Sequence, residues 1–113
     1  MLKILIAGGG SGGHVAPAIA IAEALVERSC DVLIAHSTRA IDVKMIAKTP
    51  FSSTTLPAKP LSLLPQRFVK FCIGFVRSVS ETKKLIRTND ISCVVATGGF
   101  VAAPALFAAR TLR

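Results

Sequence analysis

Positions 8 to 13 of the chain read Gly-Gly-Gly-Ser-Gly-Gly, and this glycine-rich run most constrains the fold. It follows a short apolar segment, residues 2–7, which is typical of a buried parallel strand. After the run, residues 17–28 place Ala, Ile, Leu and Val at helical spacing, and residues 31–36 form a second apolar segment. Strand, glycine turn, helix and strand make a βαβ unit, which predicts a parallel sheet.

The same alternation continues along the rest of the chain. Helices are expected at residues 40–48, 66–87 and 101–112, strands at 51–56 and 91–96, and a loop with three prolines at 57–65. This pattern predicts an α/β fold with a Rossmann-like, doubly wound parallel sheet in one domain, residues 1–113. Because such sheets usually continue with more strands, we expect the chain to be part of a longer protein.

Charge is distributed unevenly over the 113 residues. The formal net charge is +8, and residues 57–113 hold nine cations and two anions. Such an excess indicates an anionic partner, which could be phosphate groups, nucleic acid or a membrane surface. Three widely spaced cysteines predict neither a disulfide framework nor a zinc site, and they fit a reducing cytoplasm. Residues 91–109 carry no charge, but a Gly-Gly pair and a proline interrupt them, so no membrane span is expected.

The glycine run has the chemistry of an anion-binding loop. Gly8, Gly10 and Gly13 satisfy G-x-G-x-x-G between a strand and a helix. Without side chains, backbone N–H groups can approach a diphosphate, and the helix N-terminus adds positive potential. A P-loop needs Lys after the last glycine, where this chain has His14. A dinucleotide site needs an acid after the second strand, but the nearest one, Asp42, lies in the next helix.

His14 is the candidate catalytic residue of this loop. It stands at the start of the expected helix, which Pro17 opens, and imidazole titrates near neutral pH. A general base or a sugar or phosphate contact is one interpretation, and a helix cap or core residue is the other. A second glycine turn, Gly98-Gly99, also follows an apolar strand and precedes a helix. Both turns are expected to line one crevice, because the carboxyl ends of parallel strands meet at one edge.

Residues 7–18, the Gly-Gly-Phe turn at 98–100 and the helix between them resemble the N-terminal domain of the MurG glycosyltransferases. The resemblance implies half of a GT-B fold, in which two Rossmann-like domains enclose a cleft. It further implies that the donor and its diphosphate border Gly10, Ser11, Gly12 and Gly13, that His14 is catalytic, and that the acceptor side includes Gly98, Gly99 and Phe100. Three positions depart from the usual pattern: Ser11 replaces Thr, Phe100 replaces Tyr and Ala102 replaces Ser.

The resemblance also implies an activity in peptidoglycan synthesis. N-acetylglucosamine would pass, with inversion, from UDP-N-acetylglucosamine to undecaprenyl-diphosphate-linked N-acetylmuramoyl-pentapeptide. The donor-binding C-terminal domain of the family lies beyond Arg113, so the 113-residue piece is expected to be inactive alone. No cofactor is expected, and the residues contain no cluster with metal-ligand spacing, so no metal is expected either.

Residues 66–87 form a helical pattern with an apolar arc of about 200°, wider than a core contact needs. The apolar arc contains Leu64, Phe68, Val69, Phe71, Cys72, Ile73, Phe75, Val76 and Val79, and the opposite side carries Arg67, Lys70, Arg77 and Lys84. One interpretation is an ordinary helix that covers the sheet with a solvated basic face. The other is association with an anionic leaflet at the cytoplasmic face of the plasma membrane. The residues expected to make that contact are Leu64, Arg67, Phe68, Lys70, Phe71 and Phe75.

Two further functions compete with a transferase half. A non-catalytic subunit that docks a separate catalytic chain on the membrane would carry the same features. Nucleic-acid binding would use the basic half, but the aromatic residues lie on an apolar arc and are not interleaved with Arg on an open face. We therefore expect no nucleic-acid partner.

Overall fold

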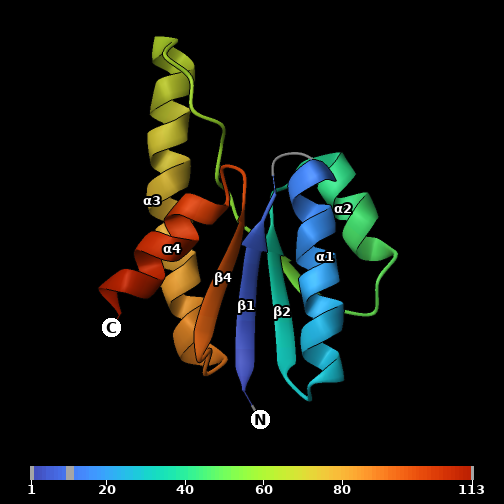
Figure 1. Cartoon of the computed structure of the whole chain (residues 1–113). Helices are drawn as coiled ribbons and strands as arrows, with labels where there is room; N and C mark the ends of the chain where they lie inside the picture. The colour runs from blue at the N-terminus through green and yellow to red at the C-terminus, as the bar shows by residue number, and fades with distance from the viewer. Residues whose placement is uncertain (1, 10–11, 113) are drawn as a thin grey trace.

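The fold is a parallel sheet of four strands. The computed structural model describes residues 2–9 and 12–112, and for residues 12–14 the backbone alone. The strands are β1 (Lys3–Gly8), β2 (Asp31–His36), β3 (Ser52–Thr55) and β4 (Cys93–Gly98). Their order across the sheet is β3-β2-β1-β4, and every pairing is parallel (Figure 1). The sheet predicted from the alternating pattern is confirmed.

Helices cover both faces of the sheet. They are α1 (Gly12–Glu27), α2 (Ala40–Ala47), α3 (Pro65–Thr88) and α4 (Ala102–Thr111). Helices α1 and α2 lie on one face, and α3 and α4 lie on the other (Figure 1). The chain winds outward from β1 to β3 and then crosses back to β4 through α3. This is the doubly wound arrangement that the sequence predicts.

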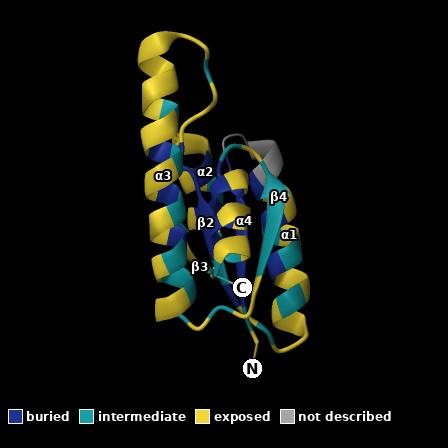
Figure 2. Cartoon of the chain, turned by 90° about the vertical axis from the view of Figure 1, so that its left-hand side faces the viewer, coloured by how far each residue is buried: buried dark blue, intermediate teal, exposed yellow. Residues whose placement is uncertain are grey.

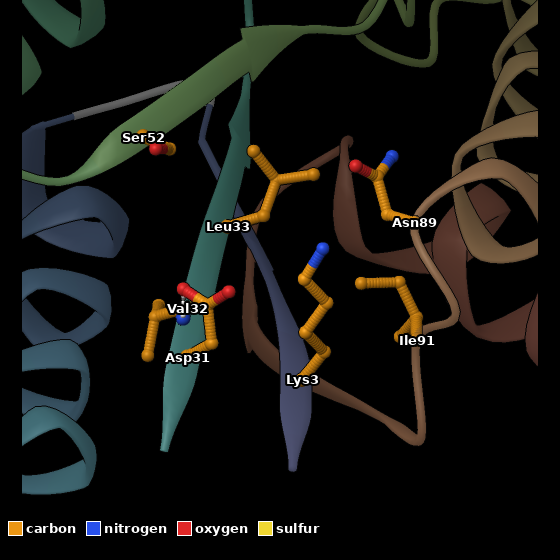
Figure 3. A pocket seen from close by; sticks show the side chains of 7 residues that line it. All are labelled: Lys3, Asp31, Val32, Leu33, Ser52, Asn89 and Ile91. Atoms are coloured by element: carbon orange, nitrogen blue, oxygen red, sulfur yellow. Dashed lines mark hydrogen bonds between the residues drawn. The ribbon is translucent and has the colours of Figure 1, made fainter. Parts of the chain in front are cut away.

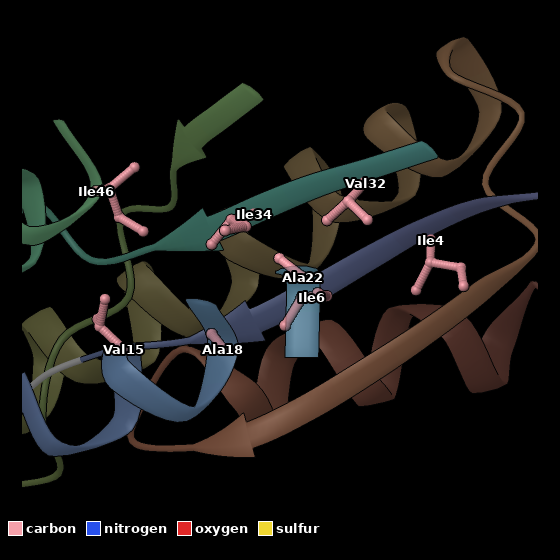
Figure 4. Packing of buried hydrophobic residues seen from close by; sticks show 8 residues of the cluster. All are labelled: Ile4, Ile6, Val15, Ala18, Ala22, Val32, Ile34 and Ile46. Atoms are coloured by element: carbon pink, nitrogen blue, oxygen red, sulfur yellow. The ribbon is translucent and has the colours of Figure 1, made fainter. Parts of the chain in front are cut away.

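Each central strand contributes to two hydrophobic clusters. Ile4 and Ile6 of β1 belong to the cluster on the α1 face, to which Val15, Ala18 and Ala22 of α1 also contribute (Figure 4). Leu5, the residue between them, belongs to the cluster on the α4 face. Because both faces are covered, the strand reads as a continuous apolar run and not as an alternation.

The first helix begins earlier than the sequence predicts. We expected it at Pro17, but α1 starts at Gly12 and encloses Pro17. Glycine is a poor helix former, yet burial of Val15 and Ala18 against the sheet stabilises this first turn. Pro17 is exposed and has no amide proton, so it donates no hydrogen bond to the carbonyl of Gly13.

Helix α3 packs on the domain through small residues. Gly74, Ser78 and Thr82 are its buried positions, spaced one turn apart. Most of the apolar arc is left outside, as the exposed fractions of Phe68 (43%) and Val76 (67%) show (Figure 2). The N-terminal half of α3 extends past the sheet (Figure 1). In the described part of the chain, no helix combines the length and apolar character needed to cross a membrane.

Candidate functional site

The sheet order places the topological switch point between β1 and β4. From β1 the chain enters α1 on one face, and from β4 it enters α4 on the other. At such a switch point the two connections diverge, and open α/β sheets bind ligands there, outside the carboxyl ends of the strands. Both glycine segments follow these two strands.

A hydrogen bond joins the two glycine segments directly. The backbone nitrogen of Gly9 donates to the carbonyl oxygen of Gly98 across 3.3 Å. Just before this contact, the pairing of β1 with β4 shifts register, so that Gly8 lies opposite Gly98. The two glycine segments therefore meet at one edge of the sheet, and the crevice that they are expected to line stays a prediction.

The second glycine turn has a backbone that only glycine adopts easily. Gly98 has φ of 130° and Gly99 has φ of 80°. A side chain at either position would strain the turn. Phe100 follows, half-buried in the cluster on the α4 face, and the guanidinium carbon of Arg39 lies 5.4 Å from the centre of its ring.

The buried side chain of Asp42 packs against the first glycine segment. Asp42 is fully buried, and its Oδ2 accepts hydrogen bonds from the Ser37 hydroxyl and, at 3.2 Å, from the Ser37 backbone nitrogen. Gly9 lies directly against this pair: a Cβ at Gly9 would lie 2.6 Å from Asp42 Oδ2 and 2.8 Å from the Ser37 nitrogen. Close contacts therefore join the glycine segment to Ser37, just after β2, and to the first turn of α2.

Another pocket opens at the opposite end of the sheet and lies away from this site. It has a volume of about 80 Å³ and includes Lys3, Asp31 and Ser52, the first residues of three strands (Figure 3). Neither glycine segment contributes to it. The amino ends of parallel strands are not where such sheets place their ligands.

Comparison with known proteins identifies the family. The model of the glycosyltransferase family 28 N-terminal domain matches residues 4–113. The chain belongs to this family. A transferase of Lactococcus lactis subsp. lactis is 34% identical over 99% of the chain, and one of Corynebacterium diphtheriae is 29% identical over 96%. Both are named UDP-N-acetylglucosamine–N-acetylmuramyl-(pentapeptide) pyrophosphoryl-undecaprenol N-acetylglucosamine transferase.

Solved structures show that the family fold is the one described above. The crystal structure of Acinetobacter baumannii MurG matches 99% of the chain with a TM-score of 0.82 at 20% identity. A UGT transferase from Siraitia grosvenorii, in complex with UDP, matches with a TM-score of 0.65 at 15% identity. The match covers 33% of the MurG chain and 26% of the UGT chain. The chain spans about a third of the length of the curated relatives it matches.

The structure locates only some of the site residues predicted from the family resemblance. Gly98, Gly99 and Phe100 lie together at the carboxyl edge. Gly12, Gly13 and His14 form the first turn of α1, while Gly10 and Ser11 lie outside the described residues. The side chain of His14 also lies outside the description, so its catalytic role stays a prediction.

Three residues near the edge were not singled out as site residues from the sequence. Ser37 and Asp42 support Gly9, and Arg39 lies against Phe100. One signal was available for Asp42: it is the third residue of a short helix, a position from which acidic side chains reach back past the helix start. No such signal points to Arg39, because its neighbour Phe100 is distant in sequence.

Proposed function

We propose that this chain forms the acceptor side of an N-acetylglucosamine transferase of peptidoglycan synthesis. The donor is UDP-N-acetylglucosamine, and the acceptor is N-acetylmuramoyl-pentapeptide linked through diphosphate to undecaprenol. Similarity to relatives with that printed activity supports the substrates. A donor-binding C-terminal domain completes the cleft.

The hydrogen bond between Gly9 and Gly98 carries the proposal. It supports a single anion-binding edge made by two glycine segments at the switch point of the sheet. Backbone N–H groups and the N-terminus of α1 at this edge are suited to a diphosphate. Gly10, Ser11, Gly12 and Gly13 border the donor diphosphate, while Gly98, Gly99 and Phe100 face the acceptor.

The chemistry is an inverting displacement. The acceptor 4-hydroxyl attacks the anomeric carbon of the donor sugar, the bond from that carbon to UDP breaks, and His14 accepts the hydroxyl proton. Negative charge develops on the departing diphosphate. Donors fixed in advance by the fold stabilise that charge without reorganising during the reaction.

The chain acts at the cytoplasmic face of the plasma membrane. Residues 61–64 and the apolar arc of α3 offer exposed leucine and phenylalanine side chains, among them Leu63 at 88% and Leu64 at 57%. Phe71 and Phe75 are half-buried; their rings contact each other in a tilted arrangement, and the edge-to-face contact of Phe75 with Phe107 continues the row onto α4. Arg67 and Lys70 are exposed on the same part of α3, where phospholipid headgroups would meet cations.

A transfer assay tests the proposal. Labelled N-acetylglucosamine is offered from its UDP donor to a short-chain lipid acceptor. The protein encoded by the complete reading frame is compared with its His14→Ala and His14→Gln variants and with residues 1–113 alone. We expect transfer by the complete protein, a loss of about 10²- to 10⁴-fold in kcat for both variants, and none from residues 1–113.

Each other result has a definite meaning. Full activity of His14→Ala would make His14 a structural residue of the α1 start and leave the transferase proposal intact. No transfer by the complete protein would overturn the enzyme proposal and favour a membrane-docking subunit. A His14 variant with raised KM and unchanged kcat would assign this residue to substrate binding.

A further inference from the structure

Residues 37–42 connect β2 to the first turn of α2 and contact both glycine segments. Ser37 and Asp42 lie against Gly9, and Arg39 lies against Phe100. The proposed transfer chemistry uses none of these three side chains. A backbone edge that binds an anion has no side chains of its own to hold its shape, so the neighbouring residues must hold it.

Hydrogen bonds within residues 37–42 fix the conformation of this segment. The Ser37 hydroxyl donates to Asp42 Oδ2 and accepts from the backbone nitrogen of Arg39 at 3.2 Å. The Ser37 backbone nitrogen also donates to Asp42 Oδ2, at 3.2 Å. Ser37 and Asp42 are 1% and 0% exposed, so water does not compete for the bonds between them. The carboxylate therefore holds residues 37–39 in one conformation before any ligand binds.

The Ser37–Asp42 pair limits where Gly9 can lie. A Cβ at Gly9 would lie 2.6 Å from Asp42 Oδ2, 2.8 Å from the Ser37 nitrogen and 3.3 Å from the His36 Cα. Even without a side chain, Gly9 is closely packed here. From this position its nitrogen donates to the Gly98 carbonyl oxygen at 3.3 Å. Gly9 is thus held by contacts to the pair and to the second glycine turn.

Arg39 connects residues 37–42 to the second glycine turn by another route. Its guanidinium carbon lies 5.4 Å from the centre of the Phe100 ring, within the range of a cation–π interaction. The backbone of Arg39 is extended, with φ of −63° and ψ of 142°, and its nitrogen is bonded to the Ser37 hydroxyl. Phe100 is partly buried and packs against the cluster on the α4 face. The stacked pair therefore joins the start of α2 to that cluster.

These contacts form a closed ring around the carboxyl edge, which we call the edge ring. Its members are Gly9, Asp42, Ser37, Arg39, Phe100 and Gly98, whose carbonyl accepts the hydrogen bond from Gly9. Contacts that share one network are energetically coupled, so the loss of one weakens the others. The two glycine segments are therefore expected to keep their spacing only while the ring is intact.

We propose that Asp42 and Arg39 are positioning residues of the transfer reaction, which act through the edge ring. Asp42 fixes the first glycine segment, and Arg39 fixes the acceptor-facing Phe100. The coupling between the two glycine segments rests on the contacts alone, whereas its effect on transfer rests on the proposed function. Small displacements of the groups that orient substrates cost large factors in kcat/KM.

Amide hydrogen exchange followed by NMR tests the edge ring without a substrate. Arg39→Gln changes the ring on the Phe100 side, away from Gly9. We expect the Gly9 amide to exchange at least about fivefold faster in this variant, relative to the Ile6 amide, which reports global stability. Arg39→Lys keeps a cation over the Phe100 ring and should recover most of the protection.

Lys44→Gln is the matched control for Arg39→Gln. It removes the same charge from an exposed position of α2 and should leave the exchange of the Gly9 amide unchanged. Unchanged exchange in Arg39→Gln, or an equal increase in Lys44→Gln, would overturn the proposal. Arg39 is exposed, so its variants are expected to fold and decide the matter even if substitutions at Asp42 do not.

A double-mutant cycle tests whether the ring is closed. Asp42→Asn should raise the exchange rate of the Gly9 amide at least about fivefold, and adding Arg39→Gln should raise it less than about twofold further. Two independent contacts would instead multiply their separate effects. A multiplicative result would therefore overturn the coupling that the proposal requires.

Steady-state kinetics of the complete protein test the effect on transfer. We expect Arg39→Gln to raise the KM for the lipid acceptor, and Asp42→Asn to raise the KM for UDP-N-acetylglucosamine, each at least about fivefold. A loss of folded protein lowers apparent kcat and leaves KM unchanged, so this split separates positioning from stability. Ile4→Val, a core change at the opposite end of β1, is the control and should leave both KM values unchanged.

The exchange and kinetic results together have distinct outcomes. A raised acceptor KM with unchanged exchange of the Gly9 amide would make Arg39 a direct substrate contact and overturn its positioning role. Unchanged KM values in an active protein would overturn the effect on transfer. No transfer by the complete unaltered protein would overturn the proposed function, whereas the exchange data would still report whether the ring couples the two glycine segments.

Discussion

The backbone nitrogen of Gly9 lies 3.3 Å from the carbonyl oxygen of Gly98, and this hydrogen bond links the exits of β1 and β4. Gly9 also packs against Asp42 of α2 and Ser37, the residue that follows β2. Consequently one glycine contacts three segments of the carboxyl edge.

Gly9→Ala should destabilise the fold. Its methyl group would meet Asp42 Oδ2 and the Ser37 nitrogen at distances that force the backbone to move. We expect the free energy of unfolding in urea to fall by about 1–3 kcal/mol. The penalty should be smaller in an Asp42→Ala background, where one obstructing group is gone. Additive penalties in this double-mutant cycle would show that the contact does not determine the effect.

Asp42→Asn should weaken the same edge. The amide keeps one acceptor oxygen but loses the charge that strengthens two hydrogen bonds from Ser37. We expect a loss of about 1–3 kcal/mol in the free energy of unfolding, measured by urea denaturation. Glu23→Gln, an exposed acid-to-amide change in α1, is the control and should change stability by less than about 0.5 kcal/mol.

The two glycines of the second turn should respond differently to substitution. Gly98→Ala should cost about 2–3 kcal/mol, because φ of 130° lies where residues with a Cβ are rarely found. At Gly99, with φ of 80°, Ala should cost about 1–2 kcal/mol and Asn less, since Asn tolerates left-handed backbone. Thermal unfolding of the three variants gives the order. If Gly98→Ala unfolded at the same temperature as Gly99→Asn, the result would contradict the backbone conformation of this turn.

Ser78→Ala should stabilise the protein. The Ser78 hydroxyl is buried and has no hydrogen-bond partner among the described residues, so it contributes a desolvation cost. We expect a gain of about 0.5–1 kcal/mol, and a loss of about 1–3 kcal/mol for Ser78→Leu, which overfills the contact of α3 with the domain. Ser80→Ala, exposed on the same helix, measures helix propensity alone and should give the smaller gain.

Apolar residues of α3 should be dispensable for folding and needed for membrane binding. Phe68→Gln/Ile73→Gln removes two side chains that are 43% and 54% exposed. We expect unfolding to change little and co-sedimentation with anionic vesicles to weaken about tenfold or more. Ile41→Gln/Val43→Gln, two exposed positions on α2, is the matched control. Equal, salt-insensitive binding to anionic and neutral vesicles would remove the electrostatic part of the proposal.

Most of the fold could be predicted from local patterns. Apolar runs identify β1, β2 and β4, and a glycine turn follows β1 and β4, because central strands of a parallel sheet are buried on both faces. The edge strand β3 consists of Ser and Thr and is mostly exposed, so only its Thr/Ser-rich composition predicted it. The start of α1 could not be predicted, since Gly12 and Gly13 form helix against their propensity through the burial of Val15 and Ala18. Likewise, the sequence predicted the apolar arc of α3, but it did not predict that α3 packs on the domain through Gly74, Ser78 and Thr82.

The sequence by itself determined the βαβ order, the two glycine segments and the excess of positive charge. These are local properties, fixed by residue type and spacing along the chain. Only the tertiary structure decided that Gly9 meets Gly98, that Asp42 supports Gly9 and that Arg39 lies over the Phe100 ring. Those contacts depend on the crossover from β3 through α3 to β4, which brings residues far apart in the chain to one edge of the sheet.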